Sequence, residues 1–138
     1  MSILHLKVVT PEKAIFEGDA EMVSVKTLDG EIGILPYHIN LMTQIVPGEL
    51  RIKKGSDTTL LAVGSGLLQM ADNNLVIATD LAQKPEEINE REVEEAKKRA
   101  ESALEQNLSG EEYAIALATL EKTTAQLKVK RRHHPKTL

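Results

Sequence analysis

The sequence is poorest in the residues that carry covalent chemistry and base stacking. Its 138 residues include no cysteine, no tryptophan, one phenylalanine and two tyrosines. The absence of cysteine excludes a disulfide framework, a thiol nucleophile and a cysteine-ligated metal. Aromatic residues make up 2% of the chain, too few for a platform that stacks bases, and the net charge of −4 argues against a basic nucleic-acid surface. We therefore expect no nucleic-acid partner.

Long apolar runs are also missing. The sequence contains no stretch of 18 apolar residues, which is the length that a membrane-spanning helix requires. The first residues, MSILHL, lack the charged and then apolar pattern of a secretory signal. These features favour a soluble intracellular protein.

Candidate catalytic and metal-binding residues are few. None of the four histidines stands at metal-ligand spacing with a carboxylate, and the adjacent pair His133-His134 is a poor chelate. The segment Gly64-x-Gly66 lacks the third glycine of a dinucleotide-binding loop, because position 69 is Gln, and it indicates a strand bend or bulge. No Walker loop, nucleophile elbow or kinase signature occurs. We expect a binding or regulatory protein with no catalytic residues, no cofactor and no metal.

Charge is distributed unevenly along the chain. Residues 1–84 carry 7 basic and 10 acidic side chains, and residues 86–112 carry 4 basic and 10 acidic ones. Residues 122–138 carry 6 basic side chains and no acidic one. An acidic block followed by a basic tail indicates a partner of opposite charge, although a solvated pair of helices would give the same pattern.

Residues 1–84 have the pattern of a β-structure. Six segments, at 4–8, 22–27, 50–53, 60–63, 67–70 and 75–79, are short and either alternate or run apolar. Turn residues separate them, including Asp29-Gly30 and Asp72-Asn73-Asn74. Many short strands with frequent turns predict a sandwich or a barrel.

Residues 86–130 have the pattern of two helices. Asn89 with Glu92, and Ser109 with Glu112, predict a capping box at the start of each helix. The break at 107–110 is short, so we expect an antiparallel hairpin. The apolar face predicted for the first helix comprises Val93, Ala96, Ala100, Ala103 and Leu104. The face predicted for the second helix comprises Tyr113, Ala116, Leu117, Leu120, Thr124 and Leu127.

The predicted hairpin interface is mostly alanine on its first helix. Alanine allows close approach but contributes little burial, since each buried methylene stabilises by about 0.8 kcal/mol. We therefore expect a hairpin that is held weakly enough to open or dock again. A second stripe on the second helix (Ile115, Ala118 and Val129) could pack on the sandwich or on a partner. The simpler alternative is that alanine is present because it favours helix formation.

Several segments together resemble one known family. Residues 30–41, GEIGILPYHINL, are similar to a pattern of the epsilon subunit of bacterial and chloroplast F-type ATP synthases. Residues 9–11 (VTP), 48–52 (GELRI), 64–68 (GSGLL) and 75–77 (LVI) extend the resemblance over nearly the whole chain. Asn40 replaces the proline that is usual in this pattern, and Leu67 replaces a frequent glycine. Neither departure changes the assignment.

The resemblance implies a ten-stranded β-sandwich over residues 1–84, followed by an antiparallel two-helix hairpin with a basic tail over residues 85–138. It implies a non-catalytic subunit of the central rotor stalk, which couples proton-driven rotation to ATP synthesis. The implied partners are the gamma subunit, the c ring, and the alpha and beta subunits. The implied location is peripheral, on the cytoplasmic face of the bacterial plasma (inner) membrane, which is reached only indirectly through the c ring.

The resemblance also implies sites. The sandwich would contact gamma and the c ring through Asp29, Gly30, Glu31 and His38. The hairpin would extend into the alpha/beta hexamer and hinder ATP hydrolysis. The basic residues that would then face an acidic region of the beta subunit are Lys122, Lys128, Lys130, Arg131 and Arg132.

Some relatives bind ATP through a motif Ile/Leu-Asp-x-x-Arg-Ala at the start of the first helix. The corresponding residues here are Ile88, Asn89, Arg91, Glu92 and Val93, so the motif is degenerate. Its arginine position holds Glu92, and Arg91 lies about 100° away around a helix. We expect weak or absent ATP binding.

One alternative function belongs to a different class. The Glu111-Glu112 pair near the hairpin turn is compatible with a stand-alone hairpin effector that inserts into another large machine, such as RNA polymerase. Co-purification with alpha, beta and gamma subunits, or with polymerase, discriminates between the two.

Overall fold

The computed structural model describes residues 2–133 and consists of ten strands followed by two long helices. The first five strands are β1 (Leu4–Val9), β2 (Ala14–Ala20), β3 (Met22–Thr27), β4 (Gly30–Ile34) and β5 (Leu41–Ile45). The second five are β6 (Gly48–Lys54), β7 (Asp57–Val63), β8 (Gly66–Ala71), β9 (Asn74–Thr79) and β10 (Ala82–Gln83). A short 3₁₀ helix, η1 (Pro85–Glu87), precedes α1 (Glu90–Leu104) and α2 (Gly110–His133).

The ten strands form one hydrogen-bonded sheet that folds into two layers. The strand order is β10-β7-β6-β3-β5-β8-β9-β1-β2, with β4 paired to the side of β3. β3 and β5 are joined only at Thr27 and Ile45, so the sheet bends there and divides. By this strand order, one layer holds β10, β7, β6, β3 and β4, and the other holds β5, β8, β9, β1 and β2. The predicted ten-stranded sandwich with a helical hairpin is confirmed.

Alternation along the strands builds the core between the layers. In β1, Leu4, Leu6 and Val8 are fully buried, and Leu75 and Ile77 of the parallel neighbour β9 are buried with them. The same cluster takes in Leu50, Leu61 and Leu68 and the other inward residues of β3, β5 and β6 to β8, without any residue of α1 or α2. The sandwich therefore has a core of its own.

The predicted helix starts are confirmed, and of each predicted capping box the described residues show the N-cap hydrogen bond and not the return bond to the N-cap backbone. Asn89 precedes α1, and its side-chain oxygen accepts a hydrogen bond from the backbone N–H of Glu92 at 3.1 Å. Ser109 precedes α2, and its hydroxyl accepts from the N–H of Glu112 at 3.2 Å and donates to the Glu112 carboxylate at 3.0 Å. Each side chain satisfies a backbone donor that the helix leaves free.

The face predicted for α2 is only partly right. Ala116 and Leu127 are buried, but Tyr113 and Leu117 are 49% and 38% exposed, and Thr124 is exposed. α2 packs against two different surfaces, α1 along its length and β6 and β7 near its C-terminal end. A single heptad stripe cannot describe two contact faces. The residues that become buried instead are Thr123, Ala125, Gln126 and Val129.

Candidate functional site

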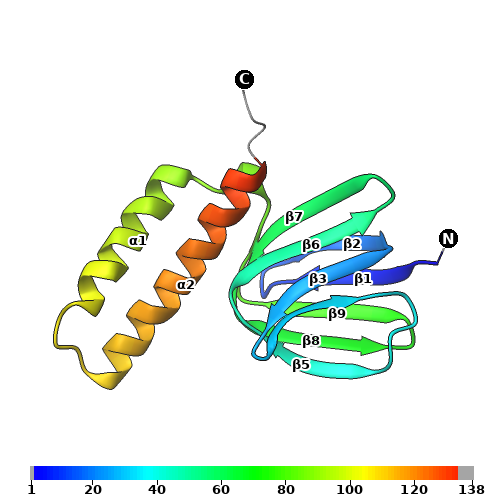
Figure 1. The fold of residues 1–138 in the computed structure, drawn as a ribbon, viewed down its shortest axis with the longest axis horizontal. Helices are drawn as coiled ribbons and strands as arrows, with labels where there is room; N and C mark the ends of the chain where they lie inside the picture. Colours follow the sequence, from blue (N-terminus) through cyan, green and yellow to red (C-terminus); the bar gives the residue numbers. More distant parts are fainter. Residues whose placement is uncertain (1, 134–138) are drawn as a thin grey trace.

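The hairpin meets the sandwich in a small apolar cluster. In Figure 1, α2 stands between α1 and the sandwich, and the C-terminal end of α2 lies beside η1. The cluster joins the outer face of β7 to both helices and is separate from the sandwich core. Its buried members are Ala62, Ile88, Val93, Leu127 and Val129, with Leu60 partly buried against them. Few apolar side chains therefore hold the hairpin in place.

A buried carboxylate lies beside this cluster. The Glu49 side chain, on the outer face of β6, is only 5% exposed. Its Oε1 accepts a hydrogen bond from the Arg132 guanidinium of α2 at 2.9 Å, and the Nε of Arg51 lies 3.8 Å away. Its other oxygen, Oε2, is buried and has no hydrogen-bond partner among residues 2–133. Glu49 thus attaches the hairpin while its unsatisfied oxygen opposes tight docking.

Two more basic residues at the end of α2 have partners in the same chain. The Lys130 ammonium donates to the carbonyl oxygen of Pro85 at 3.0 Å, and Arg131 pairs with Glu90 and Glu94 of α1. Of the basic residues predicted to face the beta subunit, Lys130, Arg131 and Arg132 therefore contact their own chain in this conformation. Lys122 and Lys128 are exposed.

The contact between the two helices is lined by small residues, as the alanine pattern predicts. An open cavity of about 360 Å³ lies between them and includes Ala96, Ala100, Ala103 and Ala116 in its lining. Small side chains leave room here and contribute little burial. The contact between α1 and α2 therefore relies on small side chains.

The residues predicted to face gamma and the c ring do not form one cluster. Asp29 and Gly30 lie in the turn between β3 and β4, and Glu31 beside them pairs with Arg51 at 2.7 Å. His38 lies beyond the opposite end of β4, a strand roughly 13 Å long. The structure therefore places these residues at two ends of a strand, and their partners stay a prediction.

Sequence reasoning missed an exposed apolar surface near His38. Tyr37 and Ile39 are 73% and 80% exposed in the loop after β4, and Met42 and Leu67 project outward from β5 and β8. Tyr37 has a φ of 63°, and its N–H donates to the side-chain oxygen of Asn73 at 2.8 Å. Large contiguous patches of exposed apolar residues are typical of protein contacts, whereas single exposed apolar residues are common on any surface. Inward and outward positions alternate along residues 41–45, and this pattern could have predicted that the Met42 side chain is exposed.

Residues of the degenerate ATP motif have packing and helix-capping roles in this structure. Ile88 and Val93 are buried in the apolar cluster, and Asn89 caps α1. Arg91 is 88% exposed and lies 3.6 Å from Glu95, on its own helix. Glu92 is exposed at the position where the motif has arginine. The segment offers a carboxylate where a phosphate would need a cation.

We expect the isolated chain to show no micromolar ATP binding at this segment, because Glu92 repels a phosphate and Arg91 points along the helix surface. Isothermal titration calorimetry with ATP measures this. The matched comparison is Glu92→Arg, which restores the motif arginine and is expected to raise the affinity. Micromolar binding by the unmodified chain would contradict the prediction.

No helix within residues 2–133 is long and apolar enough to cross a membrane. Within the same range, no group of three or more histidine or carboxylate side chains is arranged to hold a metal ion.

The fold and the site define a β-sandwich with its own core that carries a docked helical hairpin and exposed apolar residues. The comparisons identify which family it is. Residues 3–85 match the family described as "ATP synthase, Delta/Epsilon chain, beta-sandwich domain", and residues 86–131 match "ATP synthase, Delta/Epsilon chain, long alpha-helix domain". The chain belongs to this family of ATP synthase subunits, and so is a non-catalytic subunit of the central stalk.

Similar proteins agree with this family. The chain is 43% identical over 106 residues to the ATP synthase epsilon chain of Halalkalibacterium halodurans, covering 77% of this chain and 80% of that one. It is 38% identical over 130 residues to that of Chloroflexus aggregans, covering 94% of both. A chain in the cryo-EM structure of the Euglena gracilis mitochondrial ATP synthase has the same fold, with a TM-score of 0.80 at 21% identity. That match covers 93% of this chain and 81% of the other.

Proposed function

We propose that this subunit has two tasks, divided between its two parts. The sandwich docks on the gamma subunit and the c ring, and so ties the rotor to proton-driven rotation during ATP synthesis. The hairpin is a mobile brake that leaves the sandwich, extends towards the alpha and beta subunits and hinders ATP hydrolysis. The working position is peripheral, on the cytoplasmic face of the bacterial inner membrane, through contact with the c ring.

The proposed mobility of the hairpin is supported by the small size of the apolar cluster that attaches it to the sandwich. The sandwich core is complete without the hairpin, and the apolar cluster between them is small: Leu60, Ala62, Ile88, Val93, Leu127 and Val129. Hydrogen bonds from Gln126 to Gln83, from Lys130 to the carbonyl of Pro85 and from Arg132 to Glu49 add to the attachment. The helices then contact each other across small residues. A hairpin attached in this way can detach without unfolding the part that docks on the stalk.

The charged contacts support a choice between two positions. In the docked hairpin, Arg132 pairs with Glu49, and Arg131 pairs with Glu90 and Glu94. An acidic surface on the beta subunit would compete for the same guanidinium groups. Docking on the sandwich and pairing with the beta subunit are then mutually exclusive states of Arg132, whereas the pairs of Arg131 lie within the hairpin.

Removing the hairpin tests the proposed inhibition of ATP hydrolysis. A chain that ends after Pro85 keeps every residue of the sandwich core, so it should still assemble with gamma. The complex that contains it is expected to hydrolyse ATP faster than the complex with the full chain, because nothing then opposes rotation in that direction. Steady-state ATPase activity of the two purified complexes measures the difference.

A matched control keeps the hairpin and changes an exposed residue of α1, Lys98→Ala, which should leave hydrolysis unchanged. Unchanged hydrolysis in the truncated complex would contradict the proposed inhibition by the hairpin. It would leave the proposed docking of the sandwich intact. Loss of co-purification with gamma would instead contradict the docking role.

A further inference from the structure

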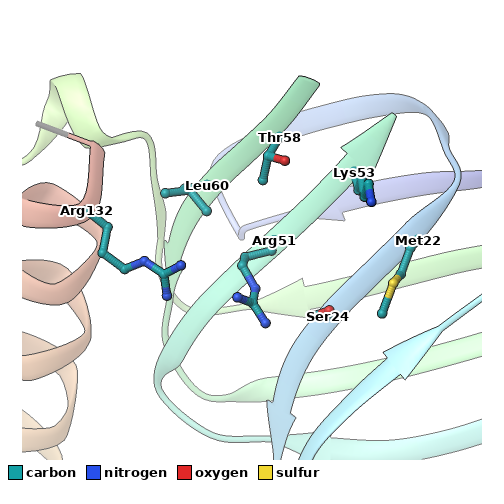
Figure 2. A pocket seen from close by; sticks show the side chains of 7 residues that line it. All are labelled: Met22, Ser24, Arg51, Lys53, Thr58, Leu60 and Arg132. Carbon is teal, nitrogen blue, oxygen red and sulfur yellow. The ribbon is translucent and has the colours of Figure 1, made fainter. Parts of the chain in front are cut away.

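Four charged side chains form a continuous ion-pair network from β4 to the end of α2. Arg51 donates to Glu31 of β4 at 2.7 Å, and its Nε lies 3.8 Å from Oε1 of Glu49 on its own strand, β6. The same Oε1 accepts a hydrogen bond from Arg132 at 2.9 Å. Figure 2 shows Arg51 on β6 and Arg132 reaching towards it from α2. The network therefore joins the strand that follows the β3–β4 turn to the hairpin.

Glu49 is the centre of this network and has one charge for two arginines. Its side chain is 5% exposed, whereas those of Arg51 and Arg132 are 37% and 47% exposed. Among residues 2–133, Arg132 alone donates a hydrogen bond to Glu49, and Oε2 has no hydrogen-bond partner. A buried carboxylate depends on its cations because it has lost its water. The two arginines therefore compete for the charge of Glu49.

Arg51 and Arg132 differ in where they are when the hairpin leaves the sandwich. Arg132 leaves with α2, but Arg51 lies two residues from Glu49 on the same face of β6 and stays beside it. Arg51 is therefore the cation that can replace Arg132, and Oε2 of Glu49 offers it an acceptor. A replacement partner for Glu49 lowers the free energy of the detached state and so raises its population.

Glu31 restrains this replacement. Its carboxylate holds the Arg51 guanidinium at 2.7 Å, while the Nε of Arg51 stays 3.8 Å from Glu49, beyond hydrogen-bond distance. Lys26 lies across from Glu31 on β3 but makes no ion pair with it in the described part of the chain. Without the charge of Glu31, Arg51 would be free to donate to Glu49. Two arginines would then lie beside one carboxylate, and their mutual repulsion also favours detachment.

We propose that Glu31 controls the attachment of the hairpin through Arg51. While Glu31 holds Arg51, Arg132 is the main partner of Glu49 and the hairpin stays docked. A basic side chain on the surface that receives the β3–β4 turn would pair with Glu31 and release Arg51 to Glu49, which weakens the contact with Arg132. This step with a partner rests on the proposed function, whereas the coupling between Glu31 and the hairpin is a property of the free chain.

The absence of cysteine allows detachment to be measured directly. Ala62 is completely buried in the apolar cluster between β7 and α2, so a thiol introduced by Ala62→Cys is protected from iodoacetamide while the hairpin is docked. Its alkylation rate then follows the detached fraction. Ala20→Cys places the thiol in the sandwich core instead, where the rate reports opening of the sandwich.

Neutralising Glu31 and Arg51 should change the alkylation rate at position 62 in opposite directions. Glu31→Gln should raise the rate about threefold, the effect of one half-exposed ion pair, and Arg51→Gln should lower it by a similar factor. Once Arg51→Gln is present, Glu31→Gln should have no further effect, because Glu31 acts through Arg51. The rate at position 20 should be the same in all variants. The matched control is Glu17→Gln on β2, which removes the same charge from a side chain that is also 56% exposed.

Three results in the free chain would overturn the proposal: an equal effect of Glu31→Gln with and without Arg51, a faster rate in Arg51→Gln, or an equal rise in Glu17→Gln. In the assembled complex, the partner's basic group already holds Glu31, so Glu31→Gln should leave the rate unchanged. A rise there as large as in the free chain would overturn the step with the partner. Failure of the proposed function is a separate result, because it appears as unchanged hydrolysis after truncation or as loss of co-purification with gamma.

Discussion

Replacing Val129 with aspartate is expected to detach the hairpin from the sandwich while the sandwich stays folded. Val129 is completely buried in the apolar cluster between α2 and β7. A carboxylate there would be desolvated without a partner, which costs several kcal/mol and exceeds what a few apolar contacts supply. The sandwich core contains no residue of α2, so its packing should not change.

Two-dimensional NMR of the isolated subunit measures the detachment. Signals of Leu60 and Ala62, on the outer face of β7, should move because they lose their cover, and signals of core residues such as Leu6 and Leu75 should stay in place. Ile115→Asp is the matched control, because it adds the same charge to the same helix at a side chain that is 61% exposed.

The outcome separates two accounts of the interface. If Val129→Asp shifts the core signals together with those of β7, or unfolds the whole chain in one transition, the hairpin and sandwich form a single cooperative unit. The hairpin would then be too firmly integrated to move alone. If Ile115→Asp detaches the hairpin equally well, the effect comes from charge on α2 rather than from the cluster.

Alternation and turn residues were enough to predict the class of fold. The inward residues of β1 and β6, such as Leu4, Leu6, Leu50 and Ile52, follow the period of two that a half-buried strand requires. The Asp29-Gly30 turn holds a glycine at φ 112°, and the Asp72-Asn73 turn has φ values of 51° and 62°. Local patterns specify such features because only a few residues tolerate positive φ.

The attachment of the hairpin could not be predicted in the same way. Glu49 and Arg132 are separated by 83 positions, and nothing local marks either of them as a partner of the other. Sequence reasoning placed Arg131 and Arg132 towards another subunit, whereas the structure gives both of them partners in the same chain. Burial of Glu49 follows from where α2 lies across β6, which is a property of the tertiary fold.

Gly66→Ala is expected to destabilise the sandwich by about 3 kcal/mol or more. The chain crosses from β7 in one layer to β8 in the other at Gly64-Ser65-Gly66, the segment that the sequence indicates as a bend. A Cβ added at Gly66 would lie 2.0 Å from the carbonyl oxygen of Ala78 and 2.8 Å from the Cα of Thr79. Both are backbone atoms of the neighbouring strand β9, which cannot rotate away as a side chain can. Urea unfolding followed by far-UV circular dichroism measures the loss.

Gly64→Ala is the matched control, since it makes the same change two residues earlier. Its Cβ would meet the Asp80 carboxylate first, at 2.0 Å, and that exposed side chain can move aside. We expect a loss of about 1 kcal/mol, well below that of Gly66→Ala. Equal losses at both positions would contradict the explanation by backbone contact. Position 67, directly after Gly66, tolerates a bulky leucine because the Leu67 side chain is 57% exposed. The constraint on this segment therefore lies in the approach of two backbones at Gly66 and not in the glycine content of the motif.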